Sequence, residues 1–500
     1  MSQPIAKVLI VGGGTAGWIT AAALAKLLPR TIRIELVESD AIGTVGVGEA
    51  TIPQIRRLNM ILGIDEDEFV RETKGTFKLG IEFRDWGRKG ESYIHTFGDV
   101  GMPLAGLGFH HYWLRARKAG DGAGLWDFSL HGAACGARKF ARMERVGNTR
   151  MTGLAYAFHF DAALYALYLR RYAEARGVQR KEGRICRVDR DGESGRIVSV
   201  TTEDDSCMQA DLFIDCSGFR GILIGETLGV GYRDWSRWLP CNRAVAVPSE
   251  RSDPLLPYTQ AAAGDAGWQW RIPLQHRTGN GHVFCDAFTT ESAATDGLLE
   301  RLDAPATDAP RLLRFTTGRR EHFWYKNCVS IGLASGFLEP LESTSIHLVQ
   351  SNVSRLIELF PDASMDEARI REYNRLVGAE YEAIRDFLIL HYHQTRRDDT
   401  EFWRYCAAMD IPDTLREKMD IFISSGCFYR DPDDLFREAS WLQVMVGQGL
   451  LPRSYHPMAD RLTADQLRDY MDSIRRIISQ TVDALPAHAD FVAQIAPAGA

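Results

Sequence analysis

The chain has 500 residues, of which 45% are hydrophobic and 25% charged, a composition typical of a soluble globular protein with room for two modules. A net charge of −7 argues against nucleic acid as the main partner, because a phosphate backbone requires a concentrated basic face. The sequence contains no run of about 18 apolar residues, so no membrane span is predicted. The N-terminus lacks the pattern of a secretory signal. The nine cysteines are scattered without CxxC pairs. We therefore expect a cytoplasmic protein with reduced thiols and without structural metal, membrane or nucleic-acid partners.

The N-terminal segment has the pattern of a dinucleotide-binding unit. Residues 8–11 form an apolar run typical of a buried parallel strand, residues 12–17 read Gly-Gly-Gly-Thr-Ala-Gly, and residues 18–28 are an Ala- and Leu-rich helical stretch. A second apolar run, residues 32–37, ends at Glu38. The order strand, glycine turn, helix, strand and acid predicts a βαβ unit that binds a dinucleotide.

Each glycine of this turn has a physical role. Gly12 permits a tight turn, Gly14 lets the backbone approach a pyrophosphate, and Gly17 allows the helix to pack closely against the strand. The helix N-terminus carries a partial positive charge that favours phosphate. Glu38 can accept a hydrogen bond from a ribose hydroxyl.

Later segments favour FAD over NAD as that dinucleotide. A second glycine-rich segment follows soon after Glu38, at residues 46–53. Residues 210–219 and 327–340 are similar to the second and third signature segments of FAD-dependent hydroxylase-like enzymes. Contacts spread over so much of the chain suit an extended FAD molecule better than a compact NAD site.

The remaining patterns complete a predicted α/β fold. Asp161 is expected to cap a helix, and the C-terminal third is expected to be mainly helical, including a helix after a capping box at Thr463. We predict an FAD-binding Rossmann-like module of the hydroxylase or glutathione-reductase type, with a mainly helical substrate-binding module packed against it. The first is predicted to comprise residues 1–110, 150–230 and 320–365, and the second residues 111–149, 231–319 and 366–500.

Residues 267–274, Gly-Trp-Gln-Trp-Arg-Ile-Pro-Leu, place two tryptophans one residue apart. In a strand, positions i and i+2 share a face, so Trp268 and Trp270 would form one aromatic wall. Each indole buries a large apolar area, and its N–H requires a partner when buried. Taken alone, this stretch is explained by a half-buried strand with no special function.

Together these motifs resemble the flavin-dependent halogenases of the tryptophan halogenase family, whose hallmark is Trp-x-Trp-x-Ile-Pro. The resemblance covers nearly the whole chain. The tryptophan motif and the Leu-Glu-Ser-Thr segment are specific to this family, whereas the glycine turn is shared with many flavoproteins. The matching segments are residues 12–18, 46–53, 268–273 and 338–344, together with Lys78.

The resemblance implies an enzyme that brominates or chlorinates an electron-rich arene such as an indole. In this family FADH2 and O2 supply a C4a-hydroperoxide, a halide ion is oxidised, and hypohalous acid passes through a tunnel to the lysine that corresponds to Lys78. That lysine hydrogen-bonds the hypohalous acid or forms a haloamine, and an ammonium on a flexible stem, whose pKa shifts easily enough to give the neutral amine, suits either role. Taken alone, Lys78 would be a solvated surface lysine.

Glu342 is the second predicted catalytic residue, because a carboxylate near the arene can orient hypohalous acid and accept the arene proton. The structural alternative is an exposed acid favoured by the dipole of the helix predicted to start here. Because a helix N-terminus is also an anion site, we expect the halide on backbone N–H groups near Thr344 and Ser345. Characterised family members have glycine at the position of Ser345, a difference that leads us to expect faster bromination than chlorination.

The resemblance also implies the other site residues. Trp268 and Trp270 would screen the flavin from the arene, whereas His95 and Phe97 would stack on the arene, unless they only pack a strand. His391 and His393 lack a nearby third ligand and are attributed to helix packing, so no metal site is predicted. The remaining residues predicted to line the tunnel or to contact the substrate are Ile272, Pro273 and Trp441. The predicted FAD contacts are Gly12, Gly14, Thr15, Ala16, Gly17, Glu38, Ala41, Gly48, Glu49, Ala50, Ile185, Leu333 and Ile346.

No second dinucleotide fingerprint for NAD(P)H is evident, which fits a separate NAD(P)H-dependent flavin reductase that supplies FADH2. A homodimer is a reasonable expectation. The alternatives are a single-component aromatic hydroxylase or monooxygenase, and a non-catalytic flavin-binding module. Residues 428–455 show no evident set of groups for the charged ends of an amino acid. We therefore expect indole, or an indole or phenol unit of a larger molecule, to be a better substrate than free tryptophan.

Overall fold

The structure is a computed structural model that describes residues 3–41, 48–429 and 434–497. Residues 46 and 47 of the second glycine-rich segment lie outside the described residues. The chain divides into two compact units. Residues 75–110, which the sequence prediction placed in the flavin-binding module, belong to the second unit. The first unit comprises Met1–Lys74, Phe160–Asn242 and Arg314–Glu382, and the second Gly75–His159, Arg243–Leu313 and Ala383–Ala500.

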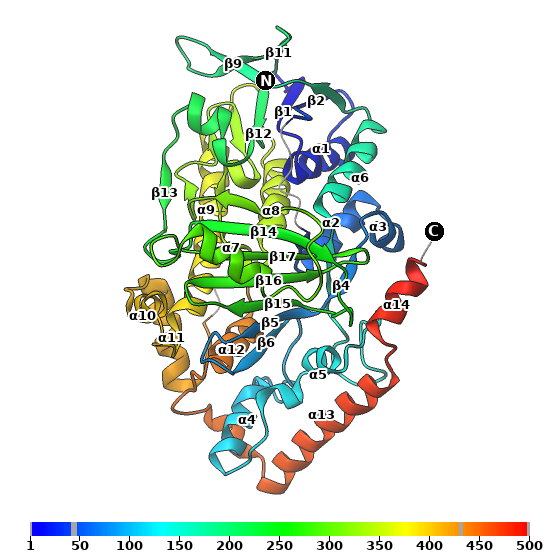
Figure 1. Ribbon diagram of the computed structural model, residues 1–500, viewed down its shortest axis with the longest axis vertical. Coiled ribbons are helices and arrows are strands. Elements are labelled where there is room, and N and C mark those ends of the chain that lie inside the picture. The colour runs from blue at the N-terminus through cyan, green and yellow to red at the C-terminus, as the bar shows by residue number, and fades with distance from the viewer. Residues whose placement is uncertain (1–2, 42–47, 430–433, 498–500) are drawn as a thin grey trace. The chain divides into compact units, whose positions relative to one another are not determined.

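A six-stranded sheet forms the centre of the first unit (Figure 1). Its inner strands are parallel, and Val11 at the end of one strand pairs with Val37 and Asp215 on its two neighbours. The apolar runs predicted at residues 8–11 and 32–37 are thus confirmed as neighbouring strands, with Val8, Leu9 and Ile10 fully buried. In spatial order the strands are β20 (Trp324–Tyr325), β21 (Cys328–Ser330), β12 (Leu212–Asp215), β1 (Lys7–Val11), β2 (Arg33–Glu38) and β8 (Gln179–Glu182).

The first unit also contains helices and smaller sheets. The helix α1 (Thr15–Leu27) begins three residues before the predicted start, because Gly14 is its N-cap and the helix follows the glycine turn directly. As predicted, Asp161 caps α6 (Ala162–Glu174) by accepting hydrogen bonds from the N–H groups of Ala163 and Leu164. The remaining elements are α2 (Gln54–Leu62), α3 (Glu66–Glu72), α8 (Ser345–Glu358), β3 (Glu49–Ala50), the antiparallel strands β9 (Ile185–Arg190), β10 (Ile197–Thr202) and β11 (Cys207–Gln209), and the strands β13 (Tyr232–Asp234), β19 (Gly318–Arg320) and β22 (Gly336–Phe337).

A seven-stranded sheet forms the centre of the second unit and contains the tryptophan motif. Strands β14 to β17 pair in antiparallel fashion, β15 pairs with β5 in parallel, and β5 pairs with β6 in antiparallel fashion. In order the strands are β18 (Arg311–Arg314), β14 (Arg243–Glu250), β17 (Arg277–Phe284), β16 (Gly267–Pro273), β15 (Thr259–Ala263), β5 (Gly80–Arg84) and β6 (Ser92–Thr96). A separate antiparallel pair joins β4 (Thr76–Lys78) to β7 (Ala157–Phe160).

The C-terminal third is helical, as predicted. Thr463 and Gln466 form the predicted capping box at the start of α13 (Ala464–Ala484). The long helix α9 (Glu367–His393) supplies residues up to Glu382 to the first unit and the rest to the second. None of the helices in the described ranges is long and apolar enough to cross a membrane. The other helices of the second unit are α4 (Phe109–Lys118), α5 (Leu130–Ala137), α7 (Glu291–Leu299), α10 (Glu401–Ala408), α11 (Asp413–Ser425), α12 (Glu438–Gly447) and α14 (His488–Ile495).

Candidate active site

The glycine turn of the first unit has the geometry that its sequence predicts. Gly12 has a φ of +109°, and a Cβ added there would lie 2.2 Å from the carbonyl oxygen of Cys216. A Cβ added at Gly17 would lie 1.9 Å from the carbonyl oxygen of Gly12, so the start of α1 packs directly on the turn. By contrast, a Cβ added at Gly14 would meet no atom within 4 Å. The turn therefore leaves room at the helix N-terminus, where the phosphates of a dinucleotide would bind.

The two later signature segments meet this turn within the same unit. Cys216 contacts Gly12, and a Cβ added at Gly332 would lie 2.7 Å from the Cβ of Ala16. The N–H of Ile331 donates to the carbonyl of Asp215 over 2.9 Å, which joins the two segments to each other. Three segments that are distant in sequence thus form one surface around the turn, and their residues fit an extended flavin nucleotide.

Glu38 lies beside the turn, where the ribose was predicted to bind. A Cβ added at Gly13 would overlap the Glu38 carboxylate, which also accepts a hydrogen bond of 2.5 Å from Nε of Arg180. The guanidinium fixes the carboxylate in place, and this contact was not predicted from the sequence.

The other predicted FAD contacts occupy different positions in the first unit. Glu49 is half-buried, and burial raises the pKa of its carboxyl to about 7. Ala41 is exposed, whereas Ile185 packs against the hydrophobic core of the unit. Gly48, Ala50 and Ile346 are buried, and Thr15, Ala16 and Leu333 are half-buried.

Glu342 and Thr344 lie at the predicted helix start. Glu342 is only 1% exposed, so the alternative of an exposed structural acid is wrong. Ser343 has a φ of +57°, and Thr344 follows it as the N-cap of α8. The Thr344 hydroxyl is buried, caps no N–H of the helix, and has no hydrogen-bond partner in the described chain. The first turn of α8, which begins at Ser345, therefore keeps N–H groups available for an anion.

A buried carboxylate on α9 fixes the same helix. Glu380 accepts hydrogen bonds from Nε2 of His347 over 2.8 Å and from Oγ of Ser351 over 2.6 Å, and it pairs with Arg355. These three residues are spaced four apart and therefore share one face of α8. Burial alone would raise the pKa of Glu380, but the hydrogen bond and charge of His347 and the charge of Arg355 outweigh it and lower the pKa to about 2. The sequence did not reveal this anchor, because the carboxylate is on α9 and its three partners are on α8.

Lys78 is the last residue of β4 in the second unit and is fully buried, so the alternative of a solvated surface lysine is wrong. Its Nζ lies 5.3 Å from the centroid of the half-buried Phe97 ring. The lysine and one of the predicted stacking residues are thus in contact.

A buried hydrogen-bond chain connects the lysine strand to the tryptophan motif. The Thr76 hydroxyl donates to the carbonyl of Pro273 over 2.7 Å and lies 3.0 Å from Nδ1 of His159. Nε2 of His159 lies 2.9 Å from Oγ1 of Thr259. Burial, followed by the charges of Lys78 and His488, keeps the pKa of His159 well below its ordinary value. This imidazole is therefore neutral at physiological pH.

The tryptophan motif is strand β16, as predicted, and both indoles are buried. The ring centroids of Trp268 and Trp270 lie 6.1 Å apart, so the two residues form one aromatic wall. Nε1 of Trp270 is buried without a hydrogen-bond partner in the described chain. A Cβ added at Gly281, which is paired with Trp270 on β17, would lie 2.0 Å from this indole. A glycine inside a strand signals such a close approach, but the sequence analysis missed Gly281.

Two further predicted substrate residues, His95 and Trp441, belong to an aromatic cluster of the second unit, whereas Ile272 and Pro273 are buried at the end of β16. The ring of His95, which is buried, lies 5.6 Å from that of Phe387. Phe387 stacks on Phe436 at 3.9 Å and meets the edge of Trp441 at 4.9 Å. The sequence analysis missed both phenylalanines, since the helical spacing of Phe387 on α9 is also typical of ordinary core residues and Phe436 lies in an irregular segment before α12. His391 packs against Phe83, in agreement with the prediction that it is a packing residue. The described residues contain no group of side chains suited to a metal ion.

Comparisons with known proteins agree with this arrangement. The family model for tryptophan halogenases matches residues 7–464. Tryptophan 6-halogenase ThaL of Streptomyces albogriseolus is 34% identical, and the match covers 99% of each chain. Among solved structures, the flavin-dependent halogenase Xcc4156 from Xanthomonas campestris is 48% identical, with a TM-score of 0.96 over 100% of both chains. BrvH, a flavin-dependent halogenase from Brevundimonas sp. BAL3, is 44% identical, with a TM-score of 0.95 over 99% of both chains.

The fold and these matches define a flavin-dependent enzyme with a Rossmann-like nucleotide-binding module. The chain belongs to the tryptophan halogenase family and is a flavin-dependent halogenase. The predicted family and fold class are confirmed. Lys78 and Glu342, the two predicted catalytic residues, lie in different compact units, and their roles remain predictions.

Proposed function

We propose that the enzyme halogenates an electron-rich arene, and that Lys78 is the residue that delivers the halogen. The observation that carries this proposal is the complete burial of Lys78 beside Phe97, on a strand that Thr76 joins to the tryptophan motif. A lysine that is buried beside an aromatic ring does not serve as a solvated surface charge. It is suited to hold a small, reactive acid away from solvent.

The chemistry begins with a halide, which the open N–H groups at the start of α8 would bind beside Thr344 and Ser345. When reduced FAD and O2 are bound, the cofactor supplies the oxidation of the halide to hypohalous acid. The Gly12–Gly17 turn and Glu38 would hold the nucleotide. FADH2 would come from a separate NAD(P)H-dependent reductase, and a homodimer remains our expectation.

In the second unit, Trp268 and Trp270 would separate the oxidising flavin from the arene, so that halogen and not oxygen is transferred. The ammonium of Lys78 would donate a hydrogen bond to hypohalous acid; alternatively, after the ammonium loses a proton, the neutral amine would take the halogen from hypohalous acid to form a haloamine, as the O–X bond breaks and water leaves. Either species would orient the electrophilic halogen toward the ring. The arene would stack among His95, Phe97 and Trp441. Glu342 would accept the proton that the ring loses when its aromaticity is restored.

The test is product formation from indole with enzyme, a flavin reductase, NADH, FAD, O2 and bromide, followed by mass spectrometry. We expect a bromine isotope pattern, and Lys78→Met should form at most a few per cent of the wild-type product. Oxygenated indole without bromine would favour the hydroxylase alternative instead. Product formation in bromide without added reductase, driven by NADH alone, would contradict the two-component proposal.

The names of ThaL and of tryptophan 7-halogenase RebH of Lentzea aerocolonigenes, which is 33% identical, make free tryptophan the natural competitor to indole. We propose that indole is preferred. A steady-state comparison of kcat/KM for the two compounds tests this, and a clearly higher value for L-tryptophan would refute it. Equal concentrations of bromide and chloride in one reaction test the proposed preference for bromide, which an excess of chlorinated product would contradict.

A further inference from the structure

The tryptophan wall is one end of a row of four indoles in the second unit. The ring centroids of Trp268 and Trp86 lie 6.3 Å apart, and those of Trp86 and Trp403 lie 5.5 Å apart. With Trp270, which contacts Trp268, the row is continuous and all four side chains are buried. Close-packed rings of this size transmit a displacement to their neighbours, because no void is left to absorb it. The orientation of the wall should therefore depend on Trp403, at the far end of the row.

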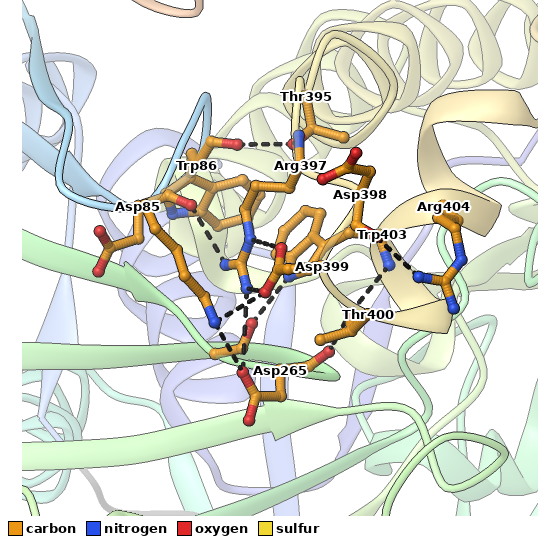
Figure 2. Close-up of polar contacts among 12 residues, drawn as sticks. Asp85, Trp86, Asp265, Thr395, Arg397, Asp398, Asp399, Thr400, Trp403 and Arg404 are labelled. Atoms are coloured by element: carbon orange, nitrogen blue, oxygen red, sulfur yellow. Dashed lines mark hydrogen bonds and ion pairs between the residues drawn. The ribbon is translucent and has the colours of Figure 1, made fainter.

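The guanidinium of Arg397 lies against Trp403, the far end of the row (Figure 2). It lies 4.8 Å from the Trp403 ring, and its side chain is 1% exposed. Nε and one terminal nitrogen donate to the two carboxylate oxygens of Asp399, each over 2.9 Å, and the other nitrogen donates to the carbonyl of Asp85 over 3.2 Å. Asp399 also pairs with Lys89 at 2.8 Å. The planar fork of Arg397 thus fixes one orientation of the terminal indole.

The same cluster clamps the turn that leads into the tryptophan strand. Nε1 of Trp403 donates to the carbonyl of Gly264 over 2.8 Å, and the Thr400 hydroxyl donates to the carbonyl of Asp265 over 2.7 Å (Figure 2). The turn closes with a hydrogen bond of 2.7 Å from the N–H of Gly264 to the carbonyl of Gly267, the first residue of β16. Both the indole row and the backbone before Trp268 are therefore held from one side.

We propose that Arg397 is a positioning residue that sets the orientation of the Trp268–Trp270 wall and thereby the fraction of oxidising equivalents that reaches the arene. The side chain of Arg397 is 1% exposed and that of Asp399 is 27% exposed, so the ion pair itself contributes little net stability, but its two parallel hydrogen bonds specify one orientation of the guanidinium. A displaced wall would let hypohalous acid escape before it meets the substrate. This inference rests on the proposed barrier role of the two tryptophans.

The test measures coupling in the holoenzyme with reductase, FAD and bromide, as brominated indole formed per NADH consumed. Free hypobromous acid is measured in parallel with monochlorodimedone as the trap. We expect Arg397→Ala to lower the product per NADH by about tenfold, the scale of effect that a small misplacement of reacting groups can produce, and to raise the trapped hypobromous acid. Trp268→Ala should do the same. Near-ultraviolet circular dichroism, which reports the packing of the tryptophans, should change in Arg397→Ala.

Three controls separate positioning from loss of fold. Guanidinium sulfate should restore coupling to Arg397→Ala, whereas methylammonium sulfate should not, because only the planar fork replaces the missing group. Trp403→Phe keeps an aromatic ring but loses the bond to Gly264, and should give a smaller change in the same direction. Arg115→Ala removes an arginine of the same unit that binds Asp460 and the carbonyl of Ala459, and should leave coupling unchanged.

The outcomes are distinguishable. If Trp268→Ala lowers coupling but Arg397→Ala and Trp403→Phe do not, the positioning role of Arg397 is wrong and the barrier stands. If Trp268→Ala itself leaves coupling unchanged, the proposed barrier fails. Should Arg397→Ala be too unstable to isolate, normal coupling in Trp403→Phe would overturn the inference.

Discussion

The surface around the glycine turn and the surface around Lys78 achieve specificity by different physical means. At the turn, Gly12 and Gly17 are placed so that backbone atoms meet backbone atoms, and Thr344 leaves the N–H groups of α8 open. Around Lys78, side chains define the site: a buried ammonium lies beside a phenyl ring, on a strand that the Thr76 hydroxyl joins to the tryptophan motif. A binding surface made of backbone atoms changes little when a neighbouring side chain is substituted. A binding surface made of side chains can be lost when one of those side chains is truncated. Substitutions in the second unit should therefore change the chemistry without changing flavin affinity.

The sharpest test of this contrast is Lys78→Met, which keeps the length of the side chain and removes the ammonium. We expect product formation to fall to at most a few per cent of the wild-type rate, while the dissociation constant for FAD stays within about twofold, because the lysine acts after the flavin has bound. Product analysis and flavin titration measure the two effects. A variant that retained substantial halogenation would remove Lys78 from the mechanism.

Glu342→Gln should have the next largest effect. The amide keeps the shape of the buried side chain but cannot accept the arene proton. We expect kcat to fall by about a hundredfold or more, the usual scale for a positioned base. An unchanged rate, measured with the same indole and bromide assay, would place the proton acceptor elsewhere.

Gly281→Ala tests whether the aromatic wall needs its present geometry. The new methyl group would overlap the Trp270 indole, which must rotate, and such overpacking costs about 1–3 kcal/mol. We expect a lower melting temperature and several-fold less product per NADH. Gly297→Ala on α7, where an added Cβ meets no atom within 4 Å, is the matched control. Normal coupling in a destabilised Gly281→Ala would show that the wall tolerates displacement.

Ser345→Gly probes the backbone surface at the start of α8. Glycine is free of the Cβ that restricts the N–H groups of the first turn, so the ratio of brominated to chlorinated product should shift by a few-fold. Competition between the two salts at equal concentration measures it. An identical ratio would mean that position 345 does not shape halide choice.

The smallest effect is a pH dependence that arises from Glu49. Burial raises the pKa of this carboxyl from 4.5 to about 7 in the folded protein, so the folded state binds the proton more tightly than the unfolded chain. The resulting loss of stability is absent below about pH 4.5, grows as the pH rises to about 7, and is constant above that. Glu49→Gln should therefore raise the melting temperature of the flavin-free protein at pH 8 by a few degrees, and by less at pH 5. Equal gains at both pH values would contradict this origin.

Local rules predicted the backbone surface well, because a turn, a helix start and a parallel strand are each encoded within a few neighbouring residues. Gly12, Gly17, Asp161 and Thr463 all have the predicted geometry. The side-chain surface could not be derived in this way. The apolar neighbours Phe77, Leu79 and Ile81 suggest a half-buried segment, but only the resemblance to a family indicated the importance of Lys78.

Long-range partners were missed for the same reason. Glu380 meets His347 across two helices, and Arg397 meets Asp85 across more than 300 residues of sequence. The sequence pattern of each residue alone is that of an ordinary helical or loop charge. Such contacts are set by tertiary packing, so they become visible only in the folded structure.

The buried hydrogen-bond chain through Thr76 has a defined direction from donor to acceptor. The single hydroxyl proton of Thr76 is donated to Pro273, so the contact with His159 must use a proton on Nδ1 of the imidazole. Because that ring is neutral, its Nε2 carries a lone pair, and the proton between it and Thr259 belongs to the threonine. The polarity of three successive hydrogen bonds is thereby fixed by one proline carbonyl, and His159 is locked in the Nδ1–H tautomer. This histidine can transmit orientation to the tryptophan strand, but it cannot serve as a proton donor to it without breaking the chain.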